Sequence, residues 1–347
     1  MKQQLPHKRQ AGKQRYDNLD GLRAYAAIGI VLMHVLSNGA YGMGGLVFGT
    51  IVPSFTDLVF VFMVISGFAM CCGYYEKMVS GQVELGAFYI KRFAKVWPFF
   101  AVMCVVDFAM SPSVDTLYEL LADLTLCFGL IPNAVISVIG VGWFLGLVFV
   151  FYFMFPFICA MLTNKKRAWL AFAVSLLIST LCVLYFKAPR ASIAYSGVFF
   201  MAGCMIYLYR EPLRRLVNRY GLYVGLLTLV AVVLYYLIGS HMPLQLLVAV
   251  FLTLLAIGRK NVVLHNVVTK RISAISLEIY LCHMMVFRVL EKIKLTHLFQ
   301  SALLSYMVTA VATLAGSIVV ALVVNWALSL LGGVFQKWKS GGKNNVQ

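Results

Sequence analysis

Apolar stretches about as long as a lipid bilayer is thick recur along the whole chain. Hydrophobic residues make up 62% of the 347 residues and charged residues only 12%, and the mean hydropathy is +0.88. A soluble domain with so few charges would lack the polar groups needed to cover its surface. A helix that crosses the membrane needs about 20 mostly apolar residues. The sequence therefore predicts an all-α fold, a polytopic transmembrane helical bundle.

We expect about ten spans and one further apolar segment of a different kind. The predicted spans cover residues 20–38, 54–75, 95–110, 141–162, 168–186, 191–209, 222–239, 242–258, 273–290 and 301–331. The additional segment, residues 117–139, carries Glu119, Asp123, Pro132 and Asn133. We interpret it as a re-entrant or interfacial element.

The basic residues predict how the chain is oriented. With the N-terminus in the cytoplasm, ten spans place 24 of the 29 Lys and Arg residues in cytoplasmic segments, as the positive-inside rule requires. Counting residues 117–139 as an eleventh span would turn three later basic clusters outward. We therefore expect a multi-pass protein of the cell (plasma) membrane with both termini cytoplasmic. The net charge of +17 lies in short clusters between apolar stretches, so nucleic-acid binding is not expected.

The chain is expected to hold one membrane domain, residues 20–331. A basic cytoplasmic segment, residues 1–19, precedes it, and a cytoplasmic tail, residues 332–347, follows. The first span is expected to remain as an uncleaved anchor. Eight cysteines are spread along apolar segments without CxxC pairs. We expect inert thiols, no metal site and no tightly bound cofactor.

Arg23 and His34 lie eleven residues apart on the first predicted span. Eleven residues return to nearly the same face of a helix, about 16 Å further along. An ionisable group at that depth is costly and indicates function, with Arg23 meeting an anion and His34 acting as general base. The structural alternative is a snorkelling Arg23 and a helix-packing His34. Asp20, which precedes the apolar run, is placed to cap the helix.

A second candidate is the basic cluster at the entry to the third predicted span. Lys91, Arg92 and Lys95 lie there among aromatic residues, and Arg92 and Lys95 share a helix face. Such groups hold phosphates, Arg through bidentate contacts and Lys as a point charge. The alternative is a topology signal with aromatic anchors at the membrane interface.

A third candidate is a group of polar residues late in the chain. Glu278, Tyr280 and His283 occupy one predicted span that carries no other charge before Arg288. These side chains either line a polar cavity or form hydrogen bonds between helices.

Six motifs in the same order resemble those of the acyltransferase-3 family of integral membrane acyltransferases. They are residues 16–24, the spacing from Arg23 to His34, residues 62–68 around Ser66, residues 89–98, residues 143–156 beginning at Trp143, and residues 275–283. The match covers about residues 16 to 335. The chain is similar to the stand-alone members, which lack an appended esterase-like domain.

The resemblance implies transfer of an acyl group, often acetyl from acetyl-CoA, to a hydroxyl of a carbohydrate or related acceptor. His34 and Arg23 would then form the catalytic pair. Arg92 and Lys95, with Lys91 beside them, would hold the phosphates of the acyl-CoA donor. Asp20, Ser66, Trp143, Glu278, Tyr280 and His283 would support the substrates or the site. A surface polysaccharide, a lipid-linked sugar, peptidoglycan and a small metabolite all stay open as acceptor, as does the side of the membrane.

The chain departs from the family pattern at three positions. Lys95 replaces the second Arg of an Arg-x-x-Arg motif, Phe60 replaces an Asp, and Val148 replaces a Glu, for which Glu278 is a candidate substitute. The competing hypothesis is a transporter of glycans or lipid-linked intermediates, but we find no internal repeat of the kind typical of transporters. A structural or sensory membrane protein, in which His34 is dispensable, is the third possibility.

Overall fold

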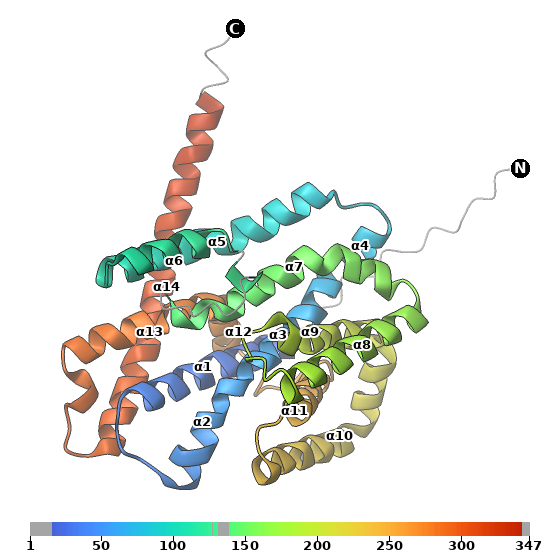
Figure 1. The fold of residues 1–347 in the computed structure, drawn as a ribbon, viewed down its shortest axis with the longest axis horizontal. Helices are drawn as coiled ribbons and strands as arrows, with labels where there is room; N and C mark the ends of the chain where they lie inside the picture. Colours follow the sequence, from blue (N-terminus) through green and yellow to red (C-terminus); the bar gives the residue numbers. More distant parts are fainter. Residues whose placement is uncertain (1–15, 127, 131–138, 342–347) are drawn as a thin grey trace, which may run out of the picture.

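The computed structural model describes residues 16–126, 128–130 and 139–341, and side chains as far as residue 331. Within these residues every regular element is a helix, which confirms the predicted all-α bundle (Figure 1). The elements are α1 (Asn18–Asn38), η1 (Val47–Ile51), α2 (Val52–Ser54), η2 (Phe55–Asp57), α3 (Leu58–Met70), η3 (Cys71–Tyr75), α4 (Glu76–Val79), α5 (Leu85–Met110), α6 (Val114–Leu124), η4 (Phe128–Leu130), η5 (Gly140–Gly142), α7 (Trp143–Leu162), α8 (Lys165–Leu184), α9 (Ile193–Leu208), α10 (Arg210–Ile238), α11 (Met242–Ala256), α12 (Val267–Ala274), α13 (Ser276–Lys292), η6 (Leu295–His297) and α14 (Ala302–Gly341).

Each of the ten predicted spans is helical, but fewer than ten of the helices are long enough to cross a membrane alone. Seven segments of the described chain qualify by length and composition, and the pair α12–α13, bent by 72°, makes an eighth. Helices α9 and α11 have 16 and 15 residues, so each spans only about 24 Å of a hydrocarbon layer about 30 Å thick. Because most of α9 is buried, protein rather than lipid covers it.

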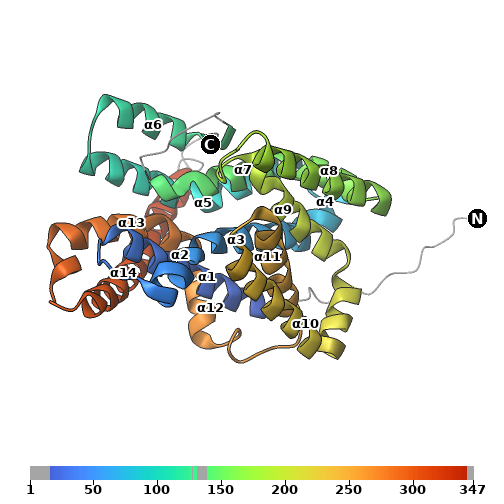
Figure 2. The same cartoon turned by 60° about the horizontal axis from the view of Figure 1, so that its bottom comes forward.

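The segment around residues 117–139 contains a short helix that does not cross the bundle. Helix α6 has 11 residues and lies along α5 (Figures 1 and 2). Ser113 caps its start, accepting a hydrogen bond from the Thr116 backbone amide at 3.0 Å. This agrees with an interfacial element, while residues 131–138 lie outside the described chain. At the other end of the protein, α14 continues to Gly341, past residue 331, and extends beyond the bundle (Figure 1).

Helix α1 lies in the middle of the bundle and packs against α3, α11, α12, α13 and α14. Next to it, α3 and α9 approach so closely that glycine is required on both helices. A Cβ at Gly67 would lie 2.2 Å from the Phe200 carbonyl oxygen, and one at Gly203 would lie 2.0 Å from that of Val64. This contact fixes the part of α3 that carries Ser66, a residue of the site described next.

Candidate active site

Two adjoining cavities lie beside the first half of α1. One, which we call the cationic cavity, has a volume of about 430 Å³. The other, the inner cavity, has a volume of about 160 Å³. Arg23, Ser66, Lys95 and Tyr152 line both, so the two cavities form one continuous site between α1, α3, α5, α7 and the α12–α13 bend.

Among the residues that the structure describes, five positive side chains and no carboxylate line the cationic cavity. The five are Arg23, Lys77, Lys91, Arg92 and Lys95. Such a concentration of positive charge at a cavity wall attracts a polyanion and is costly to keep without one. The chemistry of the wall therefore indicates a site for phosphate groups.

Arg92 is held in position by an aromatic neighbour. Its Nη2 donates a hydrogen bond of 2.7 Å to the Tyr74 hydroxyl, and its guanidinium carbon lies 4.7 Å from the centre of the Tyr74 ring. A cation stacked on an aromatic face loses little of its charge. Arg92 can therefore still bind a phosphate through its remaining N–H groups.

The structure places the predicted basic cluster along a helix that begins before it. Helix α5 begins at Leu85, ten residues before the predicted span at 95–110, and its basic residues line the cationic cavity. Lys91, Arg92 and Lys95 therefore lie along one part of a regular helix. Helix α4 adds Lys77, which the sequence indicated only as a topology charge.

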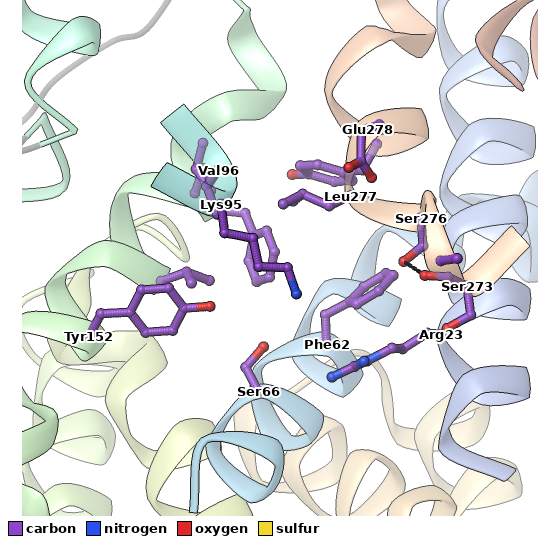
Figure 3. A pocket seen from close by; sticks show the side chains of 15 residues that line it. Arg23, Phe62, Ser66, Lys95, Val96, Tyr152, Ser273, Ser276, Leu277 and Glu278 are labelled. Carbon is purple, nitrogen blue, oxygen red and sulfur yellow. Dashed lines mark hydrogen bonds between the residues drawn. The ribbon is translucent and has the colours of Figure 1, made fainter. Parts of the chain in front are cut away.

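The inner cavity combines an apolar wall with a few polar groups. Phe62, Phe144, Leu145, Val148 and Leu277 supply apolar surface. The ionisable groups are Arg23, Lys95 and Glu278, and the hydroxyls include those of Ser66, Ser273 and Ser276. Figure 3 shows Arg23 and Lys95 pointing into the space in front of Ser66, with the Tyr152 hydroxyl directed toward them. A ligand made of a polyanion and a small uncharged group would fit the two cavities, with the polyanion in the cationic cavity and the uncharged group in the inner cavity.

The first turn of α1 explains how Arg23 is placed. The helix begins at Asn18, so Asp20 lies inside the first turn and is not the helix cap that we expected. Instead the Asp20 carboxylate accepts a hydrogen bond of 3.3 Å from the Ser273 hydroxyl. A Cβ at Gly21 would lie 2.0 Å from the Leu264 carbonyl oxygen. These contacts attach α1 to α12 and the loop before it, and they fix the direction of Arg23.

His34 lies beside His283, deeper in the bundle than the inner cavity. The centres of the two imidazole rings are 5.1 Å apart. His283 is fully buried, and its Nδ1 lies 2.7 Å from the Tyr280 carbonyl oxygen. Because a carbonyl only accepts, Nδ1 must carry the proton, which leaves Nε2 of a neutral His283 as an acceptor. That Nε2 is buried without a hydrogen-bond partner among the described residues.

Tyr280 connects the inner cavity to this pair of histidines. It lines the cavity, its hydroxyl donates to the Val141 carbonyl oxygen at 2.6 Å, and its ring centre lies 6.0 Å from that of His283. His34 lines neither of the two cavities. The predicted pair is thus divided: Arg23 faces the cavities, whereas Tyr280 and His283 lie between the inner cavity and His34.

Trp143 starts α7 and is adjacent to the site without lining either cavity. The guanidinium carbon of Arg190 lies 5.4 Å from its ring centre and 5.3 Å from that of Phe60. Asp57 forms an ion pair with Arg190 at 3.3 Å. No sequence pattern predicts this contact, because Arg190 is remote in the chain from Trp143, Phe60 and Asp57.

Several further cavity residues were not predicted from the sequence. Tyr74 and Lys77 on one side and Tyr152, Ser273 and Ser276 on the other come from segments that only the fold brings together. Tyr152 and Ser276 lie within the matched motifs, which was the available signal, and Ser273 lies two residues before the last motif. Within the described residues no group of three or more His, Cys, Asp or Glu side chains is placed to hold a metal ion.

The fold and the cavities define a multi-pass membrane protein in which a cavity lined by positive side chains adjoins a small cavity with polar and apolar walls. The chain belongs to the acyltransferase-3 family: residues 16–326 match the family described as an acyltransferase domain. This confirms the resemblance read from the motifs.

One curated relative matches a part of the chain at low sequence identity. "Protein 2 in picA locus" of Rhizobium radiobacter is 27% identical over 133 residues, which are 36% of this chain and 65% of that protein. The chain therefore covers less than two thirds of that relative. No solved structure matches the chain.

Proposed function

We propose that this protein is a membrane O-acyltransferase that takes an acetyl group from acetyl-CoA and transfers it to a hydroxyl of a cell-surface polysaccharide or its lipid-linked precursor. The observation that carries the proposal is the cationic cavity, in which five positive side chains and no carboxylate of the described chain meet at one wall. The pyrophosphate and 3′-phosphate of coenzyme A supply the polyanion that this wall requires. The carbohydrate acceptor is inferred from the family.

The donor lies with its phosphates in the cationic cavity and its thioester in the inner cavity. Arg92, Lys91 and Lys95 bind phosphate, and Lys77 adds a fourth charge. The inner cavity, about 160 Å³ in volume and walled by Phe62 and Phe144, accommodates a short acyl group and not a long chain. Arg23, which lines both cavities, lies near the thioester carbonyl and stabilises the negative charge that develops on its oxygen.

His34 acts as the general base. It takes the proton of the acceptor hydroxyl as the hydroxyl oxygen attacks the thioester carbonyl, and the C–S bond then breaks to release coenzyme A. His283, with its proton fixed on Nδ1, offers its Nε2 lone pair to the protonated His34 and steadies that imidazolium. The reacting groups meet at the Tyr280 end of the inner cavity. Because Tyr280 lies between this cavity and His34, either the Tyr280 side chain or the bound thioester must move before reaction.

The proposed orientation places the start of α1 at the cytoplasmic face, where acyl-CoA is available. This agrees with the distribution of basic residues along the sequence. The acceptor then approaches His34 from the part of the bundle beyond Tyr280 and His283.

The test uses purified protein in nanodiscs with acetyl-CoA as ligand. Isothermal titration should show binding that weakens with added salt, because exposed charge pairs are screened. Replacing Lys91, Arg92 and Lys95 together by Ala should abolish binding. The matched control replaces Arg210, Arg215 and Arg219 of α10, which line neither cavity, and should leave it unchanged. Equal binding by both triple variants would contradict the proposed donor site.

A further inference from the structure

A third cavity lies where α1 begins, separate from the two cavities of the proposed active site. It has a volume of about 250 Å³, and we call it the rim pocket. Its lining residues come from three segments, the start of α1, α10 and the turn after α11, and are Tyr16, Asp17, Asn18, Arg214, Asn218, Ile257, Gly258, Arg259 and Lys260. None of them lines the cationic or the inner cavity.

Positive charge dominates the rim pocket. Of the described residues, Arg214, Arg259 and Lys260 line it together with one carboxylate, that of Asp17. That carboxylate is already paired with the Lys260 ammonium, and His265 Nε2 lies 3.9 Å from it. Arg214 and Arg259 form no ion pair within the described part of the chain. The pocket therefore offers two guanidinium groups to an anion, and guanidinium matches the geometry of phosphate.

The rim pocket is built on a rigid junction. The Asn18 side chain donates to the Arg259 carbonyl oxygen at 2.8 Å and accepts from the Asn261 amide at 3.1 Å. The Tyr25 hydroxyl donates to the Val263 carbonyl oxygen at 2.9 Å. Because α1 holds the loop between α11 and α12 at several points, Arg259 and Lys260 extend from a fixed backbone. Figure 2 shows this loop lying between α12 and α10.

The same loop exposes apolar side chains beside the basic ones. Val262 is 82% exposed and Val263 62% exposed, and Val267 and Val268 at the start of α12 are similarly exposed. Four exposed valines next to Arg259, Lys260, Lys270 and Arg271 have the composition of a membrane-interface surface, with apolar groups entering the lipid and basic groups at the headgroups.

We propose that the rim pocket binds the phosphate of an anionic phospholipid headgroup, held by Arg214 and Arg259, while the exposed valines lie against the acyl chains. The ligand chemistry is a phosphate ester, and a soluble phosphate ester shares that chemistry. The valines favour the lipid, because a soluble ligand gains nothing from an apolar surface outside the pocket. Such a lipid would stabilise the junction between the start of α1 and the loop after α11.

The experiment measures lipid retained by the full-length protein in native mass spectrometry after exchange into detergent with phosphatidylglycerol or phosphatidylcholine. Phosphatidylglycerol should be retained preferentially by the wild-type protein. Substitution R214Q or R259Q should each weaken its retention roughly fivefold, the usual contribution of one basic residue at an anionic surface. The control pair, R215Q and R219Q on the exposed part of α10, should leave retention unchanged.

Two further arms separate the sources of phosphate and guard against misfolding. The double variant V262S/V263S should weaken retention of phosphatidylglycerol. Glycerol 3-phosphate, the soluble probe, should show no measurable binding. Tight glycerol 3-phosphate binding that R214Q abolishes would assign the pocket to a soluble phosphate ester and overturn the lipid proposal. Equal retention of both phospholipids, or equal losses in the R214Q and R215Q proteins, would also overturn it. Acetyl-CoA binding by R214Q and R259Q serves as the check that these proteins are folded.

Discussion

The imidazole rings of His34 and His283 lie with their centres 5.1 Å apart and their planes tilted by 48°, although 249 residues separate them in the sequence. Helices α1 and α13 pack directly against each other, which brings the two rings together. Because His283 donates through Nδ1 to backbone carbonyls, its Nε2 keeps its lone pair, and this atom is buried without a hydrogen-bond partner among the described residues. This pairing makes His283 a positioning residue in the proposed reaction.

Replacing His283 by Ala should lower kcat about tenfold or more, with KM for acetyl-CoA nearly unchanged. A tenfold loss is a part of the rate enhancement that general-base catalysis usually supplies. The reason is that His283 touches the base and not the donor. The measurement is a steady-state rate of coenzyme A release across pH. The acidic limb of the pH profile should move, because protonation inactivates the base His34 and the partner of the protonated His34 is lost. An unchanged profile with a lower rate would mean a purely structural role for His283.

Replacing Arg92 by Ala should raise KM for acetyl-CoA roughly ten- to hundredfold, the worth of hydrogen bonds to a charged group, with little change in kcat. R92K should recover only part of the affinity, because Lys lacks the planar fork. The comparison with dephospho-CoA as ligand shows whether Arg92 binds the 3′-phosphate. The control is R215A, and an equal KM in the R92A and R215A proteins would remove Arg92 from the donor site.

Gly203→Ala should destabilise the bundle, and Gly197→Ala should not. Both glycines lie in α9, but a Cβ at Gly203 would collide with the backbone of α3, whereas one at Gly197 would meet no atom within 4 Å. Overpacking of this kind costs about 1–3 kcal/mol, and Ala in place of Gly gains up to about 1 kcal/mol of helix propensity. Thermal unfolding in detergent measures both. Equal shifts in Tm would show that α3 and α9 are not in close contact.

The stability should fall as the pH rises from about 4 to 7, and Asp123 should be one cause. Burial, with the nearby carboxylates of Glu119 and Asp107, raises the pKa of Asp123 to about 7, whereas an unfolded Asp has a pKa of about 3.9. The folded state therefore binds the additional proton in this window, and stability is lost as that proton leaves.

Asp123→Asn should remove this dependence. The variant should match the wild-type protein at pH 4 and be more stable at pH 8, by at most about 4 kcal/mol. The control is D115N, which changes an exposed carboxylate of the same helix. Thermal unfolding at several pH values is the measurement. A D123N protein with the wild-type pH dependence would contradict the assignment.

The sequence predicted the helices well because hydropathy over about 20 residues is a local property. It predicted span lengths less well. Helix α9 is too short to cross a membrane alone, and α3 and its other neighbours cover it. This coverage depends on tertiary packing, which hydropathy does not report. Likewise helix α5 starts at Leu85 and so includes Lys91 and Arg92, which hydropathy alone treats as a boundary.

The candidate site was predictable where the residues that lie together in it belong to one motif on one helix. Arg92 and Lys95 share a face of one helix, and the structure keeps them together. The relation between Arg23 and His34 was only half predictable, because helical spacing fixes their shared face but not the walls around it. Tyr280 and His283, which separate His34 from the inner cavity, come from a helix whose packing no spacing rule places. Lys77 and Tyr74 were missed for the same reason.

The central claim is that His34 removes the proton of the acceptor hydroxyl while the donor is bound in the cationic cavity. The direct measurement is transfer or hydrolysis of acetyl-CoA labelled in its acetyl group, by wild-type and His34→Ala protein in nanodiscs, together with acetyl-CoA affinity. The rate in the H34A protein should fall about 10²–10⁴-fold, with affinity for acetyl-CoA retained because His34 does not line the donor cavities. A wild-type rate in the H34A protein would contradict the claim.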